Sequence, residues 1–215
     1  MVNVLSQKNS IVNRFIAEIR DAVIQKDRMR FRRNLERIGE IIAYEISKTL
    51  QYVTKETITP LGISSAMVPA EEPVIGTILR AGLPLHQGLL NYFDHADNAF
   101  ISAYRRHHKD GSFDIRLEYV SSPKLTNRIV ILSDPMLATG QSMVMTYKSM
   151  LEKGTPSHTH IVAVLASNEG VEYVKRHLPQ GITLWIGAVD EEMTAQSYIV
   201  PGLGDAGDLA FGTKS

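Results

Sequence analysis

The sequence predicts an α/β fold in which a mostly parallel β-sheet is flanked by helices. Short, continuously apolar segments recur along the chain and alternate with segments whose apolar residues return every three or four positions. The first kind is typical of strands buried on both faces, and the second of helices that cover them. With 215 residues, 44% hydrophobic and 21% charged, the chain is expected to form one domain, residues 1–215, around a full core.

Two helices are expected within residues 1–50. The first covers residues 11–23, with Ser10 as its N-cap. Its apolar residues at helical spacing are Val12, Phe15, Ile16, Ile19 and Val23. The second covers residues 31–50, and its apolar stripe consists of Phe31, Leu35, Ile38, Ile42, Ile46 and Leu50. Each helix is therefore expected to pack one face on the rest of the protein.

Alternating strands and helices follow. Continuous apolar runs predict buried strands at residues 73–79, 99–104, 128–133, 160–166 and 182–189. Helices are expected from about Leu83, from about Gly140 to Glu152, and near residues 169–178. In residues 113–120 apolar and polar side chains alternate strictly, which predicts a half-exposed hairpin.

Polar segments follow three of the predicted strands, at residues 80–82, 104–106 and 134–142. Ligands of open parallel sheets bind beyond the carboxyl ends of the strands. The last segment, "DPMLATGQS", runs into a helix whose first N–H groups favour an anion. The hydroxyls of Thr139 and Ser142 add donors, and the carboxylate of Asp134 suits sugar hydroxyls or a metal-bound diphosphate.

Arginines occur in the other two segments. The forked guanidinium groups of Arg80 and Arg105 match phosphate oxygens and stay charged. If their strands are neighbours of the strand before Asp134, these residues form a diphosphate clamp. The alternatives are two surface arginines and an ordinary strand–helix connection.

Near the end of the chain, "PGLGDAGD" contains the dinucleotide-binding pattern G-x-G-x-x-G at Gly202, Gly204 and Gly207. That pattern binds a dinucleotide only between a strand and a helix of a βαβ unit. Pro201 precedes it, and residues 208–215 are expected to leave no room for a helix or a second strand. The sequence therefore excludes a nicotinamide site, and the glycines need another role.

Composition excludes several further classes of protein. The chain has no cysteine, so disulfides, thiolate catalysis and cysteine zinc sites are absent. The 23 basic and 23 acidic residues cancel, and neither nucleic acid nor a membrane is expected as a partner. Because no signal peptide and no apolar run of ~18 residues is found, a cytoplasmic protein is expected. The histidines at 107–108 and 158–160 lack carboxylate or cysteine partners and predict no metal site.

Four segments resemble the uracil phosphoribosyltransferase family: "FRRNLERIGEIIAYEIS", "TILRAGLPLHQGLL", "ILSDPMLATGQSM" and "YIVPGLGDAGDLAFGTK". The resemblance implies a type I phosphoribosyltransferase-like fold, with a lid hairpin at about 107–120 and a uracil-binding segment at 190–215. It also implies a reaction: uracil and 5-phosphoribosyl-1-diphosphate (PRPP) give UMP and diphosphate with Mg²⁺ present, in pyrimidine salvage. A homo-oligomer is expected.

The resemblance also assigns roles to residues. It implies that PRPP binds to Arg80, Arg105, Asp134, Pro135, Met136, Leu137, Ala138, Thr139, Gly140, Gln141, Ser142 and Asp205. Uracil is expected at Ile199, Gly204, Asp205 and Ala206, where backbone groups pair with its C4=O and N3–H edge. The catalytic residues are expected to be Arg105, Asp134 and Asp205. No direct protein ligand is expected for Mg²⁺, which would be bound mainly through PRPP.

The sequence departs from the family in places, and it leaves alternatives open. Gln141 replaces a second glycine, and we expect Gly140 to take the unusual backbone angle instead. "ASNEG" at 166–170 and the hairpin sequence also differ from the common pattern.

One alternative is a pyrimidine-sensing, RNA-binding regulator that uses the arginines at 28, 30, 32, 33 and 37; another is a transferase for a different base. The sequence also leaves open whether GTP or another nucleotide regulates the protein.

Overall fold

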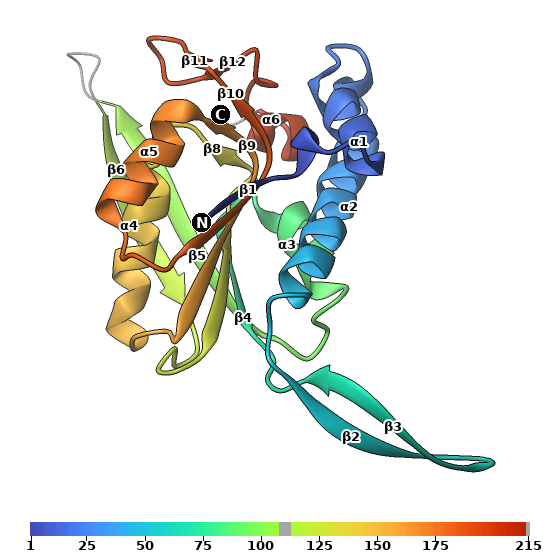
Figure 1. Cartoon of the computed structure of the whole chain (residues 1–215). Helices are drawn as coiled ribbons and strands as arrows, with labels where there is room; N and C mark the ends of the chain where they lie inside the picture. The colour runs from blue at the N-terminus through green and yellow to red at the C-terminus, as the bar shows by residue number, and fades with distance from the viewer. Residues whose placement is uncertain (108–112, 214–215) are drawn as a thin grey trace.

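The computed structural model describes residues 1–107 and 113–213, and the side chains of residues 1–102 and 118–213. Its main sheet has the strand order β1-β10-β9-β7-β4-β5-β6, with the short β8 beside β9 (Figure 1). The strands are β1 Val2–Val4, β4 Val74–Leu79, β5 Asp97–His107, β6 Phe113–Ser121, β7 Ile129–Ser133, β8 Met136–Leu137, β9 His158–Ser167 and β10 Thr183–Asp190. All neighbours in this sheet pair in parallel except β5 and β6. The predicted mostly parallel sheet is confirmed.

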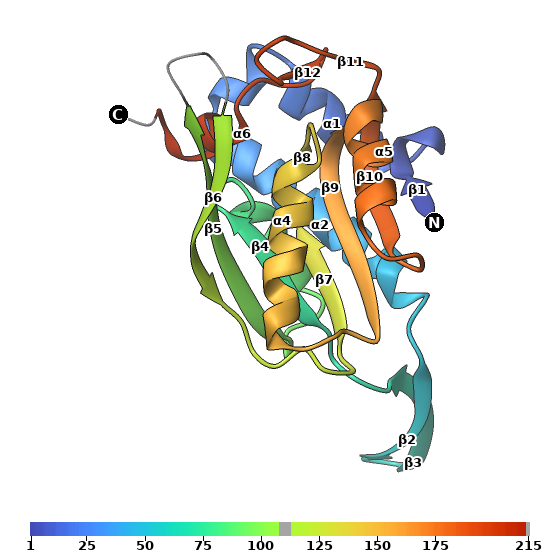
Figure 2. The same cartoon turned by 90° about the vertical axis from the view of Figure 1, so that its left-hand side faces the viewer.

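Helices cover both faces of this sheet (Figures 1 and 2). One face carries α1 Ile11–Arg20, α2 Arg28–Ser47 and α3 Leu83–Leu90, and the other carries α4 Gln141–Met150 and α5 Asn168–His177. Three short 3-10 turns, η1 Leu5–Gln7, η2 Ile24–Lys26 and η3 Leu151–Lys153, join or extend these elements. None of the helices formed by the described residues has the length and apolar character needed to cross a membrane.

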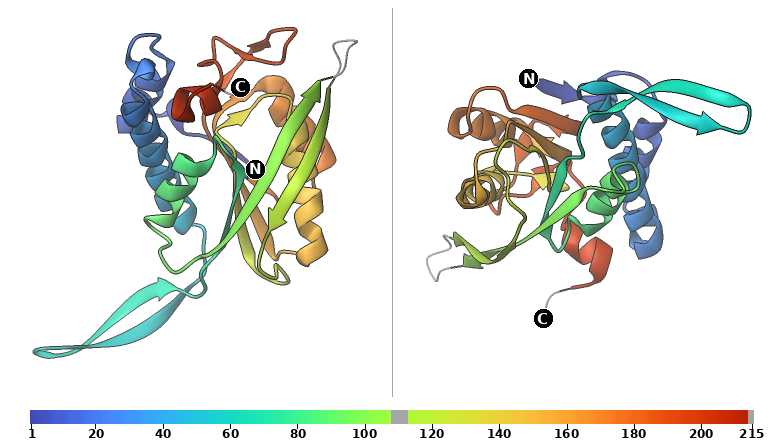
Figure 3. Two further views of the ribbon diagram at one scale, coloured as in Figure 1. Left: turned by 180° about the vertical axis from the view of Figure 1, so that it is seen from behind. Right: turned by 90° about the horizontal axis from the view of Figure 1, so that it is seen from below.

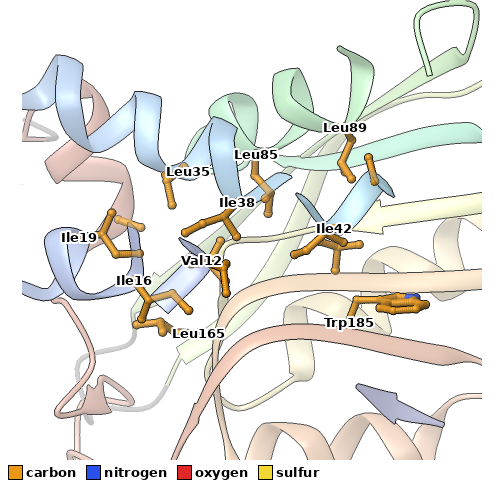
Figure 4. Close-up of a cluster of buried hydrophobic side chains, with 14 of the residues drawn as sticks. Val12, Ile16, Ile19, Leu35, Ile38, Ile42, Leu85, Leu89, Leu165 and Trp185 are labelled. Carbon is orange, nitrogen blue, oxygen red and sulfur yellow. The ribbon is translucent and has the colours of Figure 1, made fainter. Parts of the chain in front are cut away.

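The central strands β4, β7, β9 and β10 are largely apolar because each faces two cores. In β9, Val162 and Val164 point to the core under α1–α3, whereas Ile161 and Ala163 point to the core under α4 and α5. Figure 4 shows the first core, in which helix residues from α1, α2 and α3 meet Leu165 and Trp185 of the sheet. Burial on both faces thus accounts for the continuous apolar runs in the sequence.

The N-terminal helices form where predicted but with different ends. Ser10 caps α1 as expected, and its Oγ accepts the Val12 N–H at 3.4 Å. The helix stops at Arg20, so Val23 is not part of it and is 77% exposed. Asp21 ends the helix, since its carboxylate accepts the N–H groups of Val23 and Ile24 at 2.8 and 2.9 Å.

The second helix begins three residues earlier than the apolar stripe predicts. Asp27 caps α2 by accepting the Arg30 N–H at 3.0 Å. The stripe from Phe31 to Ile46 is buried as expected, but Leu50 lies beyond the helix end at Ser47.

Two hairpins extend the fold. β5 and β6 pair from Phe100↔Ser121 to His107↔Phe113, which confirms a hairpin in the expected region; residues 108–112 lie outside the described residues. The other hairpin, β2 Tyr52–Thr59 with β3 Gly62–Pro69, projects away from the body (Figure 3). It was not predicted, because almost none of its side chains is buried and its sequence carries no burial pattern.

A buried carboxylate joins the first two helices. Glu18 of α1 accepts hydrogen bonds from Arg30 at 2.8 and 3.1 Å, from Asn34 at 2.8 Å and from Arg14 at 3.2 Å. The hydrogen bonds from Arg30 are the largest cause that lowers the pKa of Glu18 from its ordinary 4.5 to about 2. The folded state thus stabilises the ionised form of Glu18, and the ionised carboxylate stabilises the fold.

We predict that Glu18→Gln lowers the free energy of unfolding by about 1–2 kcal/mol at pH 7. Because the pKa is lower in the folded chain than in the unfolded chain, the carboxylate stabilises the fold above pH 4.5, and this stabilisation is lost as the pH falls towards 2. Urea unfolding of both proteins between pH 7 and pH 3 checks this. A difference that stays constant across that range would contradict the prediction.

Candidate functional site

The three predicted polar segments begin side by side at one edge of the main sheet. β5, β4 and β7 are neighbours, with Thr77 beside Ser133 and Leu79 beside Ser102. The segments that follow β4 and β7 lie at the upper end of the sheet in Figure 1. The sheet order on which the expected convergence depended is therefore confirmed. Residues 104–106 lie within β5, which extends to His107, so the predicted strand end at residue 104 was wrong.

The loop after β7 has the backbone geometry that its sequence predicts. Oδ1 of Asp134 accepts the Met136 N–H at 3.2 Å. Gly140 is left-handed, with a φ of 77°, and α4 begins at Gln141, whose N–H donates to Oγ1 of Thr139 at 3.4 Å. The expectation that Gly140, and not Gln141, takes the unusual angle is confirmed.

Side chains of this loop divide into an inner and an outer set. Leu137 and Ala138 are 2% and 8% exposed and belong to the cores, so they can meet a ligand only through their backbone. The polar side chains are half-buried: Asp134, Thr139, Gln141 and Ser142. Together with the backbone N–H groups of the first turn of α4, they make this loop a suitable anion site.

Helix α5 supports the loop from behind, through a residue that the sequence analysis did not single out. Ser167 donates to the Ala138 carbonyl at 2.6 Å and accepts the Gly170 N–H at 2.8 Å. A Cβ on Gly140 would lie 2.8 Å from the Gly170 carbonyl oxygen, so loop and helix are in close contact. The "ASNEG" departure thus places a helix N-cap under the loop, and the available signal was a serine directly before the start of a helix.

Arg80 links its loop to the C-terminal segment. The residue follows β4 through a cis Leu79–Arg80 bond, and its Nη2 donates at 2.7 Å both to Oδ1 of Asp208 and to the Gly212 carbonyl. Its Nε is buried and has no hydrogen-bond partner among the described residues. Asp208, for which no sequence pattern predicted a role, holds this guanidinium group in place.

Arg105 lies in the last part of β5, opposite Ile115 of β6. Its strand is next to β4, so the residue lies at the edge of the sheet where Arg80 begins its loop. The side chain of Arg105 is outside the described part of the chain.

The C-terminal segment crosses the same end of the sheet. A small hairpin, β11 Glu192–Met193 with β12 Ile199–Val200, leads to α6 Ala206–Phe211. Ile199 and Ala206 are 4% and 3% exposed, so only their backbone can contact a ligand. Asp205 is half-buried and caps α6, accepting the Asp208 N–H on Oδ1 at 2.9 Å.

The three glycines of this segment serve three different purposes. A Cβ on Gly202 would lie 2.1 Å from the Ile199 carbonyl oxygen, so this glycine permits a tight turn. A Cβ on Gly207 would approach the Asp205 carboxylate at 3.1 Å and Arg80 Nε at 3.6 Å. Gly204 is exposed, has a φ of 97°, and a Cβ there would meet nothing within 4 Å. The open space beside Gly204 allows a flat ligand to approach the backbone.

One expectation about this segment was wrong. Residues 206–211 do form a helix, because Asp205 caps it and Arg32 donates to the Ala210 carbonyl at 2.6 Å. It has only six residues and follows a two-residue strand that belongs to a separate hairpin. The βαβ unit required for a dinucleotide site is therefore not formed here.

The basic run and the histidines make internal contacts. Arg30 pairs with Glu18 at 2.8 Å, Arg33 pairs with Glu36 at 2.6 Å, and Arg32 contacts α6. At the other end of the sheet, His160 accepts the Trp185 indole N–H at 3.0 Å, and burial lowers the pKa of its ring to about 3. Within residues 1–107 and 113–213, no three histidine, aspartate or glutamate side chains are grouped as metal ligands.

Comparisons with known proteins agree on one family. The model of the uracil phosphoribosyltransferase family matches residues 6–213. A uracil phosphoribosyltransferase of Porphyromonas gingivalis is 52% identical over 210 residues, which is 98% of this chain and 97% of that protein. One of Pyrococcus furiosus is 36% identical over 200 residues, 92% of this chain and 84% of that protein. A solved protein structure from Aquifex aeolicus matches with a TM-score of 0.87 at 27% identity, covering 99% of this chain and 98% of that one.

Proposed function

Because the chain belongs to the uracil phosphoribosyltransferase family, we infer that it transfers the phosphoribosyl group of PRPP to N1 of uracil. The products are UMP and diphosphate, and the reaction serves pyrimidine salvage. The observation that carries this conclusion is the family match over residues 6–213, together with 52% identity to a curated relative across nearly the whole chain. The sheet flanked by helices is a type I phosphoribosyltransferase-like fold.

We propose that the ribose 5-phosphate binds to the loop from Asp134 to Ser142. The start of α4 offers backbone N–H groups and the positive end of a helix dipole. Thr139 and Ser142 bring hydroxyl donors to the same place. Ser167 fixes the Ala138 carbonyl and so the path of the backbone that donates.

The diphosphate is proposed to bind between the loop at Arg80 and the end of β5 at Arg105. Two guanidinium groups stabilise the negative charge that grows on diphosphate as it leaves. The ion pair with Asp208 holds Arg80 beside its loop, which reduces the reorganisation needed when PRPP arrives.

Mg²⁺ is proposed to enter bound to PRPP. This cation takes oxygen ligands and is usually held by one or two carboxylates together with phosphate oxygens and water. Asp134, half-buried at the loop entrance, has a carboxylate that suits a metal-bound diphosphate, while PRPP itself supplies most of the ligands of the ion. When bound, the ion neutralises charge on the diphosphate.

Uracil is proposed to lie against Ile199 and Gly204–Ala206. The open space at Gly204 lets the ring approach the chain closely enough for backbone N–H and C=O groups to pair with its C4=O and N3–H edge. Cytosine presents the opposite donor and acceptor pattern at that edge. Substrate specificity would thus come from backbone N–H and C=O groups, which are the same whatever side chain the residue carries.

Catalysis is proposed to depend on positioning and electrostatics. As diphosphate departs, positive charge builds on the ribose ring, and the carboxylates of Asp134 and Asp205 stabilise it. The hydrogen bond from the Asp208 N–H fixes the orientation of the Asp205 carboxylate. The β5–β6 hairpin at about 107–120 is proposed to close over the substrates and exclude water.

We propose that the protein is a homo-oligomer assembled through the β2–β3 hairpin. This hairpin forms its own two-stranded sheet and exposes apolar side chains: Val53, Ile58, Leu61, Ile63 and Met67. Ile58 and Ile63 are paired on one face of the hairpin and Leu61 lies in the turn between the strands, so the apolar surface gathers at the tip. Isolated two-stranded hairpins are only marginally stable in water, and exposed apolar surface marks protein contacts. A second copy of the chain is the partner that can cover the same surface on both protomers.

We further propose that residues 1–215 act as one phosphoribosyltransferase domain in the cytoplasm. The family match leaves only the first five and last two residues outside it. A chain without cysteine needs no oxidising compartment, which favours this location.

Nucleotide formation from PRPP, Mg²⁺ and a series of free bases tests the function. We expect uracil to be converted with a kcat/KM roughly 10⁴-fold or more above that of cytosine, because a mismatched base leaves buried polar groups unpaired. Hypoxanthine is expected to give no product. Comparable kcat/KM values for cytosine or a purine would contradict the assignment.

Asp205→Asn separates the charge of this residue from its structural role. Asparagine caps helices as well as aspartate does, so α6 and the thermal midpoint should be retained. We expect kcat to fall at least about tenfold, equivalent to about 1.4 kcal/mol of transition-state stabilisation. Asp27→Asn makes the same change at the N-cap of α2 and should leave kcat within about twofold. Equal kcat values for the two variants would show that the Asp205 carboxylate is structural.

Light scattering tests the assembly. The natural protein should have at least twice the mass of one chain, and Ile58→Lys combined with Ile63→Glu should have the mass of a single chain. These two residues are paired across the hairpin, so opposite charges preserve the pairing while removing the apolar surface. Val23→Lys alters another exposed apolar residue and should leave the mass unchanged. A monomeric natural protein would rule out the proposal.

A further inference from the structure

Three residues from distant parts of the sequence are joined by hydrogen bonds where the C-terminal segment meets α1 and β10. Arg20, the last residue of α1, pairs in bidentate fashion with Asp190, the last residue of β10, through Nη1–Oδ2 and Nη2–Oδ1 distances of 2.8 Å each. Both groups also bind the backbone of Gly202. Its carbonyl accepts from Arg20 Nη1 at 3.1 Å, and its N–H donates to Asp190 Oδ2 at 3.0 Å.

This arrangement, the Arg20–Asp190–Gly202 clamp, is well shielded from water. The side chains of Arg20 and Asp190 are 21% and 8% exposed. Bidentate pairs of arginine and carboxylate are among the strongest hydrogen-bonded contacts, and they fix geometry as well as distance. Removing either partner leaves the other charge buried and uncompensated, so the three groups act as a unit.

The clamp adds polar contacts to α1 and β10 at a point where Ile199 and Leu203 pack their side chains into the core. The β11–β12 hairpin has two residues in each strand and is separate from the main sheet. The turn from Ile199 to Gly202 has no room for a side chain at Gly202, whose φ is 53°. Short irregular segments with few ladder bonds open easily unless they are held by specific contacts.

We propose that Arg20 and Asp190 are positioning residues for uracil recognition. They fix Gly202, which lies between Ile199 and Gly204, so that the backbone donors and acceptors on both sides keep the pattern that pairs with the base. The inference rests on the proposed binding of uracil to this segment. Recognition by backbone groups tolerates errors of only about 0.5 Å, so a residue that fixes the backbone determines affinity without touching the ligand.

Asp190→Asn and Arg20→Lys test the clamp with minimal change in shape. Asparagine keeps an acceptor for the Gly202 N–H but loses the charge, and lysine keeps the charge but loses the fork. We expect the KM for uracil to rise by roughly tenfold to a hundredfold in Asp190→Asn, as for a lost charged hydrogen bond. The KM for PRPP and the kcat at saturating uracil should stay within about threefold. This pattern is expected when a mutation weakens substrate binding by the same amount in the ground state and in the transition state. Arg20→Met should raise the KM for uracil more than Arg20→Lys does.

Glu18→Gln is the matched control. It disrupts another arginine–carboxylate pair, in which the carboxylate lies on α1. Arg30 Nη2 is 2.8 Å from Glu18 Oε1, and the Glu18 side chain is 11% exposed. Glu18 makes its hydrogen bonds with α1 and α2 and none with residues 199–206. This variant should lower the thermal midpoint but leave the KM for uracil within about twofold. If Glu18→Gln and Asp190→Asn raise that KM equally, the effect is general loosening and the proposal is wrong.

Gly204→Ala distinguishes failure of the clamp from failure of the uracil assignment. If Gly204→Ala raises the KM for uracil and Asp190→Asn does not, the segment binds uracil and the clamp inference is overturned. If both leave it unchanged, uracil binds elsewhere and both proposals fall.

Should Asp190→Asn not fold, hydrogen exchange in Arg20→Lys decides the question. The amides of residues 202–206 should exchange faster than in the natural protein while those of α2 keep their rates, and unchanged rates at 202–206 would overturn the inference.

Discussion

Parallel pairing of β5, β4, β7, β9 and β10 is the constraint on which the candidate site depends. Parallel neighbours must end at the same edge of a sheet, so the segments after Leu79, Ser133, Ser167 and Asp190 meet there although they come from distant parts of the chain. Burial on both faces stabilises this order, since β4, β7, β9 and β10 each pack into two cores. The irregular, polar segments are thus carried on elements that cannot shift independently.

Arginines attach the C-terminal segment to that edge. Arg20, Arg32 and Arg80 come from α1, α2 and the loop after β4, and each donates to a backbone carbonyl between Gly202 and Gly212. Two of them also pair with the carboxylates of Asp190 and Asp208. Of the basic run on α2, Arg32 makes such an attachment, and Arg30 and Arg33 pair with Glu18 and Glu36.

In the same segment, the surroundings of each glycine decide which structural role it has. The spacing G-x-G-x-x-G fits a dinucleotide site, a tight turn or an open ligand surface. Contact with Ile199 decides the role of Gly202, the nearby Asp205 carboxylate decides that of Gly207, and empty space decides that of Gly204. The chain thus uses these glycines for close approach of backbone to backbone at Gly202, of backbone to side chain at Gly207 and, in the function proposed for Gly204, of backbone to base.

The sequence by itself determined the features that depend on near neighbours in the chain. Apolar periodicity located the buried strands and α1–α5, Ser10 marked the start of α1, and Gly140 gave the left-handed entry to α4. Family resemblance added the function. Only the tertiary structure revealed the β2–β3 hairpin, the α6 helix and the pairs Arg80–Asp208 and Arg20–Asp190. The partners in those pairs are 128 and 170 residues apart, and no local pattern reports a contact that exists only once the sheet has brought its ends together.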